Sequence, residues 1–462
     1  MSKPNIRPKS MFWRTLSSFS MYSKIINKIV FPLSDKLLGL SINKNLKKNR
    51  NVQWFSNKEL NVLQKKKLYL ILQHCNNNIP YYQSIFKDYG VNLNGYLPEE
   101  IKKIPLLTKQ IIKQHLPSDL TDNTRKIYAI EKTSGSSGEQ GEFYLDREAF
   151  SKIIAAQTFY WEWAGYNFGK KAIQTGINPE RGLKKKIKDK LLFIKYSNAF
   201  RINKKIIRET LNQFRNKRNV FFIGYPSSIY SYAKLAKELD INDISFKSII
   251  SLGDKMFPFY RSLIEKQFNT EVFDTYGAAE GLMIAGECSE HKYHILSSHV
   301  YVEILDAYGN TVPDGTLGQV VVTSLDNFLM PLIRYKIGDL AIKSRKISKC
   351  KCGRSLPVLE KIIGRDTDIL FTPKLKVLVV HFFTGIFEHY PEIQQFQVEQ
   401  FEKGGKIVIK YIRGTNFSEM ILENIKNKIF DRANEKFPLD FHDVSKIASS
   451  PSGKPQIIIR GY

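Results

Sequence analysis

A short run of hydroxyl-bearing residues and glycines, Thr133-Ser134-Gly135-Ser136-Ser137-Gly138, has the composition of a phosphate-binding loop. Glycines permit backbone conformations in which successive N–H groups point inward, and the hydroxyl groups add further donors. The run lacks the Gly-Lys-Ser/Thr ending that a Walker A loop requires. Taken alone, such a run is more typical of a flexible turn, so its interpretation depends on what else the chain carries.

A second group of residues has the chemistry of a metal site. The chain has four cysteines, too few for a disulfide framework, and two of them form the pair Cys350-Lys351-Cys352-Gly353. Cys288 and His294 lie upstream, with five residues between them. Three thiolates and one imidazole make a closed tetrahedral zinc site, and the glycine allows the tight turn of a knuckle. We therefore expect a structural zinc ion held by Cys288, His294, Cys350 and Cys352. The alternatives are His291 or His299 as the histidine ligand, or unrelated reduced cysteines.

Three further motifs follow the Ser/Gly loop: Tyr276-Gly277-Ala278-Ala279-Glu280, Arg334-Tyr335-Lys336-Ile337-Gly338-Asp339 and Gly364-Arg365-Asp366-Thr367-Asp368. In this order they resemble the core motifs of adenylate-forming ligases, and most closely the phenylacetate-CoA ligase family with its capsule-biosynthesis relatives. The resemblance runs from about Gln53 to the C-terminus, and the first fifty residues lie outside it. It includes the segments 78–82, 104–109, 224–228 and Pro451-Ser452-Gly453-Lys454.

The resemblance implies an ATP site. Loop 133–138 would hold the β- and γ-phosphates through its backbone, and Tyr276, in the motif with Gly277 and Ala279, would lie against the adenine. Asp339 would accept hydrogen bonds from the ribose hydroxyls, with Arg365 nearby. The ordinary alternatives are a core tyrosine for Tyr276 and a turn residue for Asp339, and only the joint pattern argues against them.

The resemblance also implies the groups that act on the reacting atoms. Glu280 would bind Mg²⁺, a hard cation that prefers oxygen ligands. Lys454 would offset the negative charge that develops between the α-phosphate and the attacking carboxylate, and its ordinary alternative is a solvated loop lysine. The products would be an acyl-adenylate and pyrophosphate, and the acyl group would then pass to a thiol or an amine.

Some positions depart from the family pattern. Ala279 stands where the family usually has Thr or Ser, so a hydroxyl contact to the α-phosphate is missing. Thr367 stands where the hinge normally has an acid, although Asp366 and Asp368 flank it. Asp254 replaces the common glutamate on the adenine side. These changes keep open a catalytically inactive nucleotide-binding or membrane-associated scaffold as an alternative.

The hydrophobic pattern predicts an α/β protein that positions these residues. The chain has 462 residues, of which 42% are hydrophobic, enough for two domains. Strand-like and helical segments alternate from about 125 to 345, and strands near 300–305 and 318–323 indicate an antiparallel β module. The last hundred residues read as α+β. We expect a basic amphipathic segment at 1–50, a large domain at 51–363 and a small mobile domain with the catalytic lysine at 364–462.

The net charge of +27 is concentrated in two segments. Residues 1–50 hold eleven Lys or Arg against one acid, and residues 181–218 hold fourteen against two. The first segment has apolar residues at helical spacing, which predicts a basic amphipathic helix. The second reads as a basic loop for a phosphate-bearing substrate or a membrane surface. Solvated lysine-rich faces are the alternative, and no nucleic-acid-binding signature accompanies the charge, so nucleic acid is not expected.

The expected partners are therefore a small carboxylic acid, an amine or thiol acceptor and, through residues 1–50, an anionic membrane surface. Resemblance to the capsule-biosynthesis relatives favours an acceptor in surface-polysaccharide assembly, and the alternative is an aryl- or acyl-CoA ligase that uses CoA. No stretch reaches eighteen uncharged apolar residues, which predicts a cytoplasmic protein, at most peripheral at the inner face of the membrane.

Overall fold

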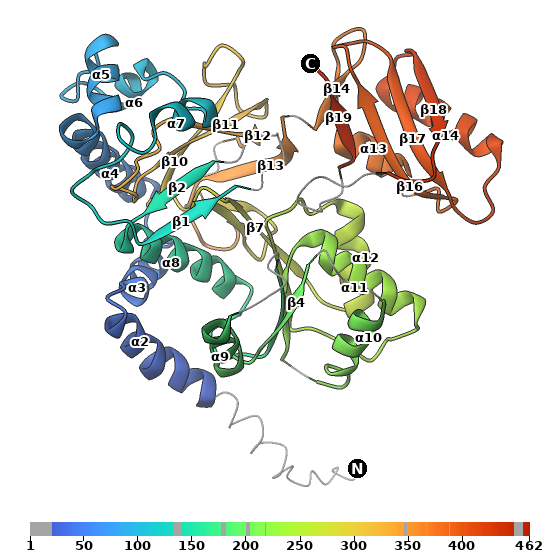
Figure 1. Ribbon diagram of the computed structural model, residues 1–462, viewed down its shortest axis with the longest axis horizontal. Coiled ribbons are helices and arrows are strands. Elements are labelled where there is room, and N and C mark those ends of the chain that lie inside the picture. The colour runs from blue at the N-terminus through green and yellow to red at the C-terminus, as the bar shows by residue number, and fades with distance from the viewer. Residues whose placement is uncertain are drawn as a thin grey trace, which may run out of the picture.

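The computed structural model describes residues 21–133, 141–176, 182–199, 204–217, 219–345, 349–366, 368–387, 389–447 and 456–462. Its main feature is a mixed sheet of eleven strands in the order β10-β11-β12-β13-β9-β8-β7-β6-β5-β3-β4. Figure 1 shows this sheet and its helices as one large body, with the C-terminal elements gathered beside it. The prediction of an α/β fold is confirmed.

One half of the sheet is parallel and has helices on both faces. Its strands are β3 (Ala172–Gly176), β4 (Ile194–Asn198), β5 (Phe221–Gly224), β6 (Ser248–Leu252) and β7 (Val272–Ala278). The helices are α8 (Arg147–Trp163), α9 (Leu183–Leu191), α10 (Lys204–Asn212), α11 (Pro226–Glu238) and α12 (Pro258–Phe268). Phe222 and Ile249 share a core with α11 and α12, whereas Phe221 and Ile250 share one with Trp161 of α8. Successive strand residues thus pack on opposite faces.

The other half is antiparallel and continues directly from the first. It consists of β8 (Leu282–Glu287), β9 (Tyr293–Ile295), β10 (Val300–Leu305), β11 (Leu317–Ser324), β12 (Tyr335–Lys343) and β13 (Val358–Arg365). Strand β8 turns back against β7 through residues 279–281, where Gly281 has a φ of +82°. The expected antiparallel strands are therefore part of the large sheet, because this tight turn keeps the hydrogen-bond ladder unbroken.

The N-terminal part of the chain forms helices and one β-hairpin. They are η1 (Ile26–Val30), α2 (Phe31–Leu37), α3 (Ile42–Val52), α4 (Asn57–Asn78), α5 (Pro80–Asp88), α6 (Leu97–Glu100), η2 (Ile101–Lys103), α7 (Lys109–His115), β1 (Ala129–Lys132) and β2 (Glu142–Leu145). Helix α4 begins with a capping box between Ser56 and Glu59. Leu46 of α3 packs with Phe159 of α8, so the N-terminal helices are docked on the large body.

The C-terminal part forms a smaller α+β unit. Its elements are β14 (Ile369–Phe371), β15 (Val377–Val379), α13 (Val380–Phe387), β16 (Ile393–Gln400), β17 (Ile407–Arg413), α14 (Glu419–Ala433), β18 (Leu439–Asp443) and β19 (Ile458–Arg460). Four of the strands form a sheet in the order β18-β17-β16-β19. Since β13 ends at Arg365 and β14 begins at Ile369, a short connection joins this unit to the large sheet.

The basic segment expected as a loop after residue 181 is in fact the helix α9. Lysine is a good helix former, and Leu183, Ile187 and Leu191 recur every fourth residue. The prediction of a loop rested on the many lysines and did not use this helical spacing. Within the described ranges, no helix has both the length and the apolar character that crossing a bilayer requires.

Candidate active site

Closely packed loops follow the carboxyl ends of the parallel strands β5 and β6. In open α/β sheets this is the edge at which ligands bind. Strand β5 ends at Gly224, where an added Cβ would come within 2.0 Å of the Thr175 hydroxyl oxygen. Gly253, just after β6, has a φ of +74° and lies against the ring of Tyr225. Ser227 at the start of α11 donates a hydrogen bond of 2.8 Å to Asp254, so neighbouring loops are tied together at this edge.

The described end of the Ser/Gly loop is closed by a pair of hydrogen bonds. The backbone N–H of Thr133 donates to the carbonyl of Gly141 at 3.0 Å, and the N–H of Gly141 donates to the Thr133 hydroxyl at 2.8 Å. Thr133 is buried. The two ends of the loop are thereby held together, while Ser134, Gly135, Ser136, Ser137 and Gly138 themselves lie outside the described residues.

Tyr276, Asp339 and Arg365 meet in one hydrogen-bonded group. The Tyr276 hydroxyl donates to Asp339 Oδ2 at 2.8 Å, and Arg365 Nε lies 3.3 Å from Asp339 Oδ1. Asp339 on β12 is paired with Arg365 on β13, so the sheet register places these two side chains together. Arg365 also donates to the Ile337 carbonyl at 2.8 Å, which holds the guanidinium against the strand.

Glu280 lies in a second group next to the first. It follows β7 in the turn 279–281 and is buried. Its Oε1 accepts a hydrogen bond of 2.8 Å from the Tyr335 hydroxyl, and Lys109 Nζ lies 3.7 Å from the same oxygen. Lys109 reaches this point because Leu107 is hydrogen-bonded to the backbone on both sides of Tyr335. Ala279 is exposed in the same turn, and Gly277 is so closely packed that a Cβ would lie 2.7 Å from the Leu282 carbonyl.

Electrostatic effects show that the two groups share one environment. Asp339 is the main cause that raises the pKa of Arg365. Burial opposes this rise, and Glu280 adds to it. Burial raises the pKa of Tyr335 far above its usual range, and the neighbouring Glu280 raises it further. Burial and then Asp339 do the same to Tyr276. Both tyrosines therefore stay protonated and act as hydrogen-bond donors to the carboxylates.

Lys255 is a site residue that sequence reasoning missed. Its Nζ is buried without a hydrogen-bond partner, 3.4 Å from the position a Cβ would take on Gly364. Burial is the main cause that lowers its pKa to about 7, and Lys361 lowers it further. The carboxylates that oppose this shift belong to Asp368, Asp339 and Asp274. The sequence feature that could have identified Lys255 is its position directly after Gly253-Asp254, because the family resemblance places Asp254 on the adenine side.

The remaining predicted site residues lie outside the residues that the structure describes. Lys454 lies in the undescribed segment 448–455, and Thr367 is also undescribed. Asp366, beside Thr367, forms an ion pair with Lys336 at 3.5 Å. The roles expected for Lys454 and for the hinge therefore stay predictions.

The expected metal ligands come together away from the nucleotide residues. One ligand atom from each of Cys288, His294, Cys350 and Cys352 lies within 4.8 Å of all the others. His294 Nε2 faces Cys352 Sγ at 3.4 Å, while its Nδ1 lies 3.0 Å from the Leu356 carbonyl. An Nδ1–H that donates to this carbonyl leaves Nε2 free for a metal ion, as is usual for a ligating histidine. Three sulfur atoms and one nitrogen atom at this spacing fit tetrahedral zinc.

The two alternative histidines are engaged elsewhere. His291 Nδ1 lies 3.9 Å from Glu287 and 3.5 Å from Arg261. His299 Nδ1 lies 2.7 Å from Asp326 Oδ2. Of the three candidates, His294 is therefore the one that faces the cysteines.

Known proteins share sequence similarity with this chain and have a similar fold. No family model matches the sequence. The CapK protein of Staphylococcus aureus is 24% identical over 86% of this chain and 88% of its own length. A phenylacetate-coenzyme A ligase of Thermus thermophilus is 21% identical over 68% and 72%. In fold, the chain is similar to a 2-hydroxyisobutyryl-CoA ligase in the postadenylation state with R3-HIB-AMP, with a TM-score of 0.73 at 16% identity over 89% and 91% of the two chains.

Proposed function

We infer that this chain belongs to the adenylate-forming superfamily, in the branch of CapK and the phenylacetate-CoA ligases. On this premise it is an AMP-forming ligase. A carboxylate oxygen of the acid attacks the α-phosphorus of ATP, and the bond to the β-phosphate breaks to release pyrophosphate. A thiol or amine then attacks the acyl carbon, loses its proton, and displaces AMP.

The observation that carries this proposal is the convergence of distant segments on one sheet edge. Tyr276, Asp339 and Arg365 form one hydrogen-bonded and ion-paired group, and Glu280 lies in a second group close enough to raise the pKa of Arg365. A buried aromatic ring, two carboxylates and a guanidinium suit the base, the ribose and a divalent cation of a nucleotide. Thr133, where loop 133–138 begins, is hydrogen-bonded to Gly141, and this closed base supports the proposed role of the loop in holding phosphates.

Each residue has a distinct task in this proposal. Asp339 accepts the ribose hydroxyls, and the Tyr276 hydroxyl orients that carboxylate. Glu280 provides an oxygen ligand for Mg²⁺, whose positive charge neutralises the phosphates when it is bound. Tyr335 and Lys109 hold Glu280 in position. Lys454 is proposed to stabilise the charge that develops during acid activation.

The acceptor separates two versions of the proposal. Similarity to proteins named phenylacetate-coenzyme A ligase supports a thiol acceptor, CoA, and an aryl or acyl acid. The resemblance of the sequence motifs to capsule-biosynthesis relatives favours an amine instead, with an amide formed on a sugar during surface-polysaccharide assembly. Mass spectrometry of reactions that contain CoA or amino sugars distinguishes a thioester product from an amide product.

Exchange of labelled pyrophosphate into ATP tests the adenylation step across a panel of carboxylic acids. We expect exchange that depends on the acid and on Mg²⁺, and a loss of about a hundredfold or more in Lys454→Ala. Absence of exchange with every acid, together with no stabilisation by ATP, would refute the proposal. Nucleotide binding without exchange, with Lys454→Ala unchanged in biological activity, would favour the inactive scaffold.

We also propose that Cys288, His294, Cys350 and Cys352 bind a structural zinc ion. The site would join the end of β8 and strand β9 to the segment that leads into β13. Its four protein ligands leave no open position, so zinc would stabilise the fold and take no part in the reaction.

The placement of the protein remains a proposal as well. We propose a cytoplasmic enzyme that meets the inner face of the membrane through residues 1–50. The support is the positive charge of this segment and the exposed apolar residues of its described part.

A further inference from the structure

The first described helix is apolar on two opposite sides. The chain is helical from residue 21 to residue 37 and includes the π-helical turn η1. Its inner side is anchored, because Ile26 is buried against Gly169 and the Asn27 amide donates to the Phe168 carbonyl at 2.7 Å. The ring of Phe31 lies 4.8 Å from that of Phe168. The helix is thus docked, and its outer side must face something else.

The outer side carries an unbroken row of large apolar side chains. These residues recur every fourth position and are between 41% and 78% exposed: Met21, Ile25, Ile29, Leu33 and Leu37. In a regular α-helix such a row drifts by about 40° at each step, and the wider π-helical turn brings it back. A surface helix of a globular protein normally carries polar residues on this side. The row therefore indicates an interaction surface.

Helix α9 carries a second row of the same kind. Leu183, Ile187 and Leu191 are also four residues apart and are between 52% and 74% exposed. Four exposed lysines border this row: Lys185, Lys186, Lys188 and Lys190. A short helix with exposed apolar residues and flanking lysines has the composition of an interfacial membrane helix.

The two rows meet, although their residues lie far apart in the sequence. The Tyr22 hydroxyl donates to the Leu191 carbonyl at 2.7 Å, and the Tyr22 ring lies 4.6 Å from the Phe193 ring. The side chain of Tyr22, next to Met21, therefore connects the N-terminal end of the first row to the Leu191 end of the second. In Figure 1, α2 and α9 lie along the same lower edge of the molecule.

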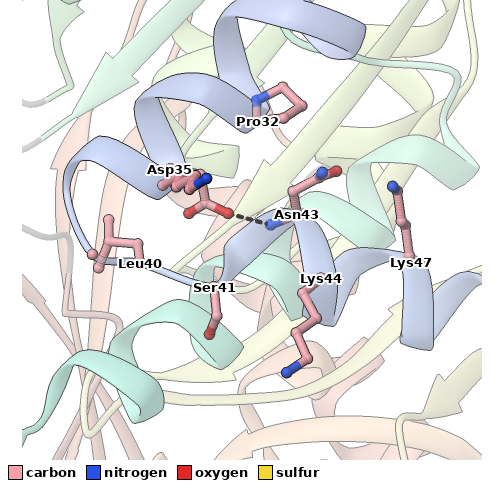
Figure 2. A pocket seen from close by; sticks show the side chains of 9 residues that line it. Pro32, Asp35, Leu40, Ser41, Asn43, Lys44 and Lys47 are labelled. Carbon is pink, nitrogen blue, oxygen red and sulfur yellow. Dashed lines mark hydrogen bonds between the residues drawn. The ribbon is translucent and has the colours of Figure 1, made fainter.

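Further positive charge lies next to the first row. A groove of about 670 Å³ between α2 and α3 is lined by Lys36, Lys44 and Lys47, and Figure 2 shows it from close by. Its one acid, Asp35, accepts hydrogen bonds from the backbone N–H groups of Ile42 at 3.0 Å and Asn43 at 2.8 Å. The Asp35 carboxylate is thus used to cap α3, and the lysines give the groove its charge.

We propose that the two rows, with their lysines, form one surface that lies on a bilayer containing anionic phospholipids. Apolar side chains would enter the acyl boundary, and lysines would meet the negative headgroups. A second copy of this chain suits the surface poorly, since pairing would bring lysines of like charge together. A nucleic acid would leave the apolar rows without a partner. This inference extends the membrane contact proposed for residues 1–50 to α9 and does not depend on the adenylation chemistry.

Co-sedimentation of the full-length protein with vesicles tests the surface. We expect binding to phosphatidylcholine vesicles that contain 30% phosphatidylglycerol, and weak binding to pure phosphatidylcholine. Ile29→Ser with Leu33→Ser should lower the partition coefficient at least tenfold. Lys185→Glu with Lys186→Glu should lower it by roughly fivefold for each lysine removed. Pyrophosphate exchange by these variants should equal that of the wild type, which separates this test from the test of the proposed function.

Matched controls exclude general effects of hydrophobicity and charge. Val62→Ser with Met420→Ser removes equally exposed apolar residues from other surfaces, and Lys234→Glu with Lys237→Glu makes the same charge change on α11. Both controls should bind like the wild type. The proposal is overturned if the wild type does not bind anionic vesicles, or if the Ile29/Leu33 variant binds as well as the controls. Sedimentation velocity gives a further refutation: a wild-type dimer that this variant dissociates would mean that a second copy covers the rows.

Discussion

The hydroxyl of Tyr276 donates a 2.8 Å hydrogen bond to Asp339, a residue 63 positions further along the chain. Tyr276 belongs to β7 at the centre of the large sheet, and Asp339 belongs to β12 in its antiparallel half. Because burial keeps the pKa of Tyr276 high, this hydroxyl always carries the proton that it donates. The bond orients the carboxylate that we propose for ribose recognition.

Replacing this carboxylate should weaken ATP binding. Asp339→Asn keeps the shape of the side chain but removes the charge that strengthens hydrogen bonds to hydroxyl groups. We expect the KM for ATP in pyrophosphate exchange to rise roughly tenfold to hundredfold, which corresponds to about 1.5–3 kcal/mol. Tyr276→Phe, which removes only the orienting hydroxyl, should have a smaller effect. An unchanged KM in Asp339→Asn would exclude Asp339 from nucleotide binding.

Glu280 should determine the requirement for Mg²⁺. Glu280→Gln retains the volume of the side chain but replaces a charged ligand oxygen with a neutral amide, which binds a hard cation less strongly. We expect the Mg²⁺ concentration for half-maximal exchange to rise and the maximal rate to fall by about a hundredfold. Tyr335→Phe is the control that keeps the Glu280 carboxylate and removes only the hydrogen bond to it. This variant should lower the free energy of unfolding by about 1 kcal/mol. Equal Mg²⁺ dependence in wild type and Glu280→Gln would argue against a metal-binding role.

Removal of a cysteine from the metal cluster should release zinc and lower stability. Cys288→Ser replaces a buried thiolate by a poor zinc ligand, and we expect the zinc content to fall from about one ion per chain to near zero. The melting temperature should fall by several degrees, because binding energy at a structural site contributes to folding. Cys75→Ser changes a buried cysteine outside the cluster and should keep the zinc. A wild-type protein without zinc by elemental analysis would rule out the site.

The buried Lys255 predicts a dependence of stability on pH. Burial lowers its pKa to about 7 in the folded protein, against an ordinary lysine value of 10.5. The unfolded chain therefore binds more protons between pH 7 and pH 10.5, and stability rises with pH in that window. The slope from this one group is about 1.4 kcal/mol per pH unit.

Denaturant unfolding of Lys255→Met without ATP tests this dependence. The variant should be more stable than the wild type by an amount that is largest at or below pH 7 and shrinks as the pH rises toward 9. Lys234→Met changes an exposed lysine and should keep the wild-type slope. A stability difference that is the same at every pH would show that Lys255 is not a buried amine with a lowered pKa.

Several elements of the fold were predictable because their signal is local. The strand predicted over 300–305 matches β10 in both bounds, and the strand predicted over 318–323 lies within β11 (Leu317–Ser324). Apolar spacing along one element depends only on that element, so a single sequence reveals it. The basic segment after residue 181 was misread as a loop, because the charge count masked the spacing of Leu183, Ile187 and Leu191.

Local patterns could not reveal which elements are neighbours. The expected antiparallel strands lie in the large domain, as predicted, but the sequence did not reveal that β8 joins them to the parallel sheet through one turn. Lys109 lies in segment 104–109 and Lys255 follows Gly253-Asp254, but neither lysine was predicted as a site residue. They belong to the site because β6 ends next to Gly364 and because Leu107 pairs with the backbone around Tyr335.

The sequence by itself determined the class of fold, and it predicted a nucleotide site and a metal site, since residue types and their order along the chain carry the chemistry of such sites. The tertiary structure alone decided that Tyr276 meets Asp339, that His294 and not His291 faces the cysteines, and that Tyr22 contacts the C-terminal end of α9. Contacts of this kind link residues tens to more than a hundred positions apart, and they depend on strand register and packing, which no short stretch of sequence contains.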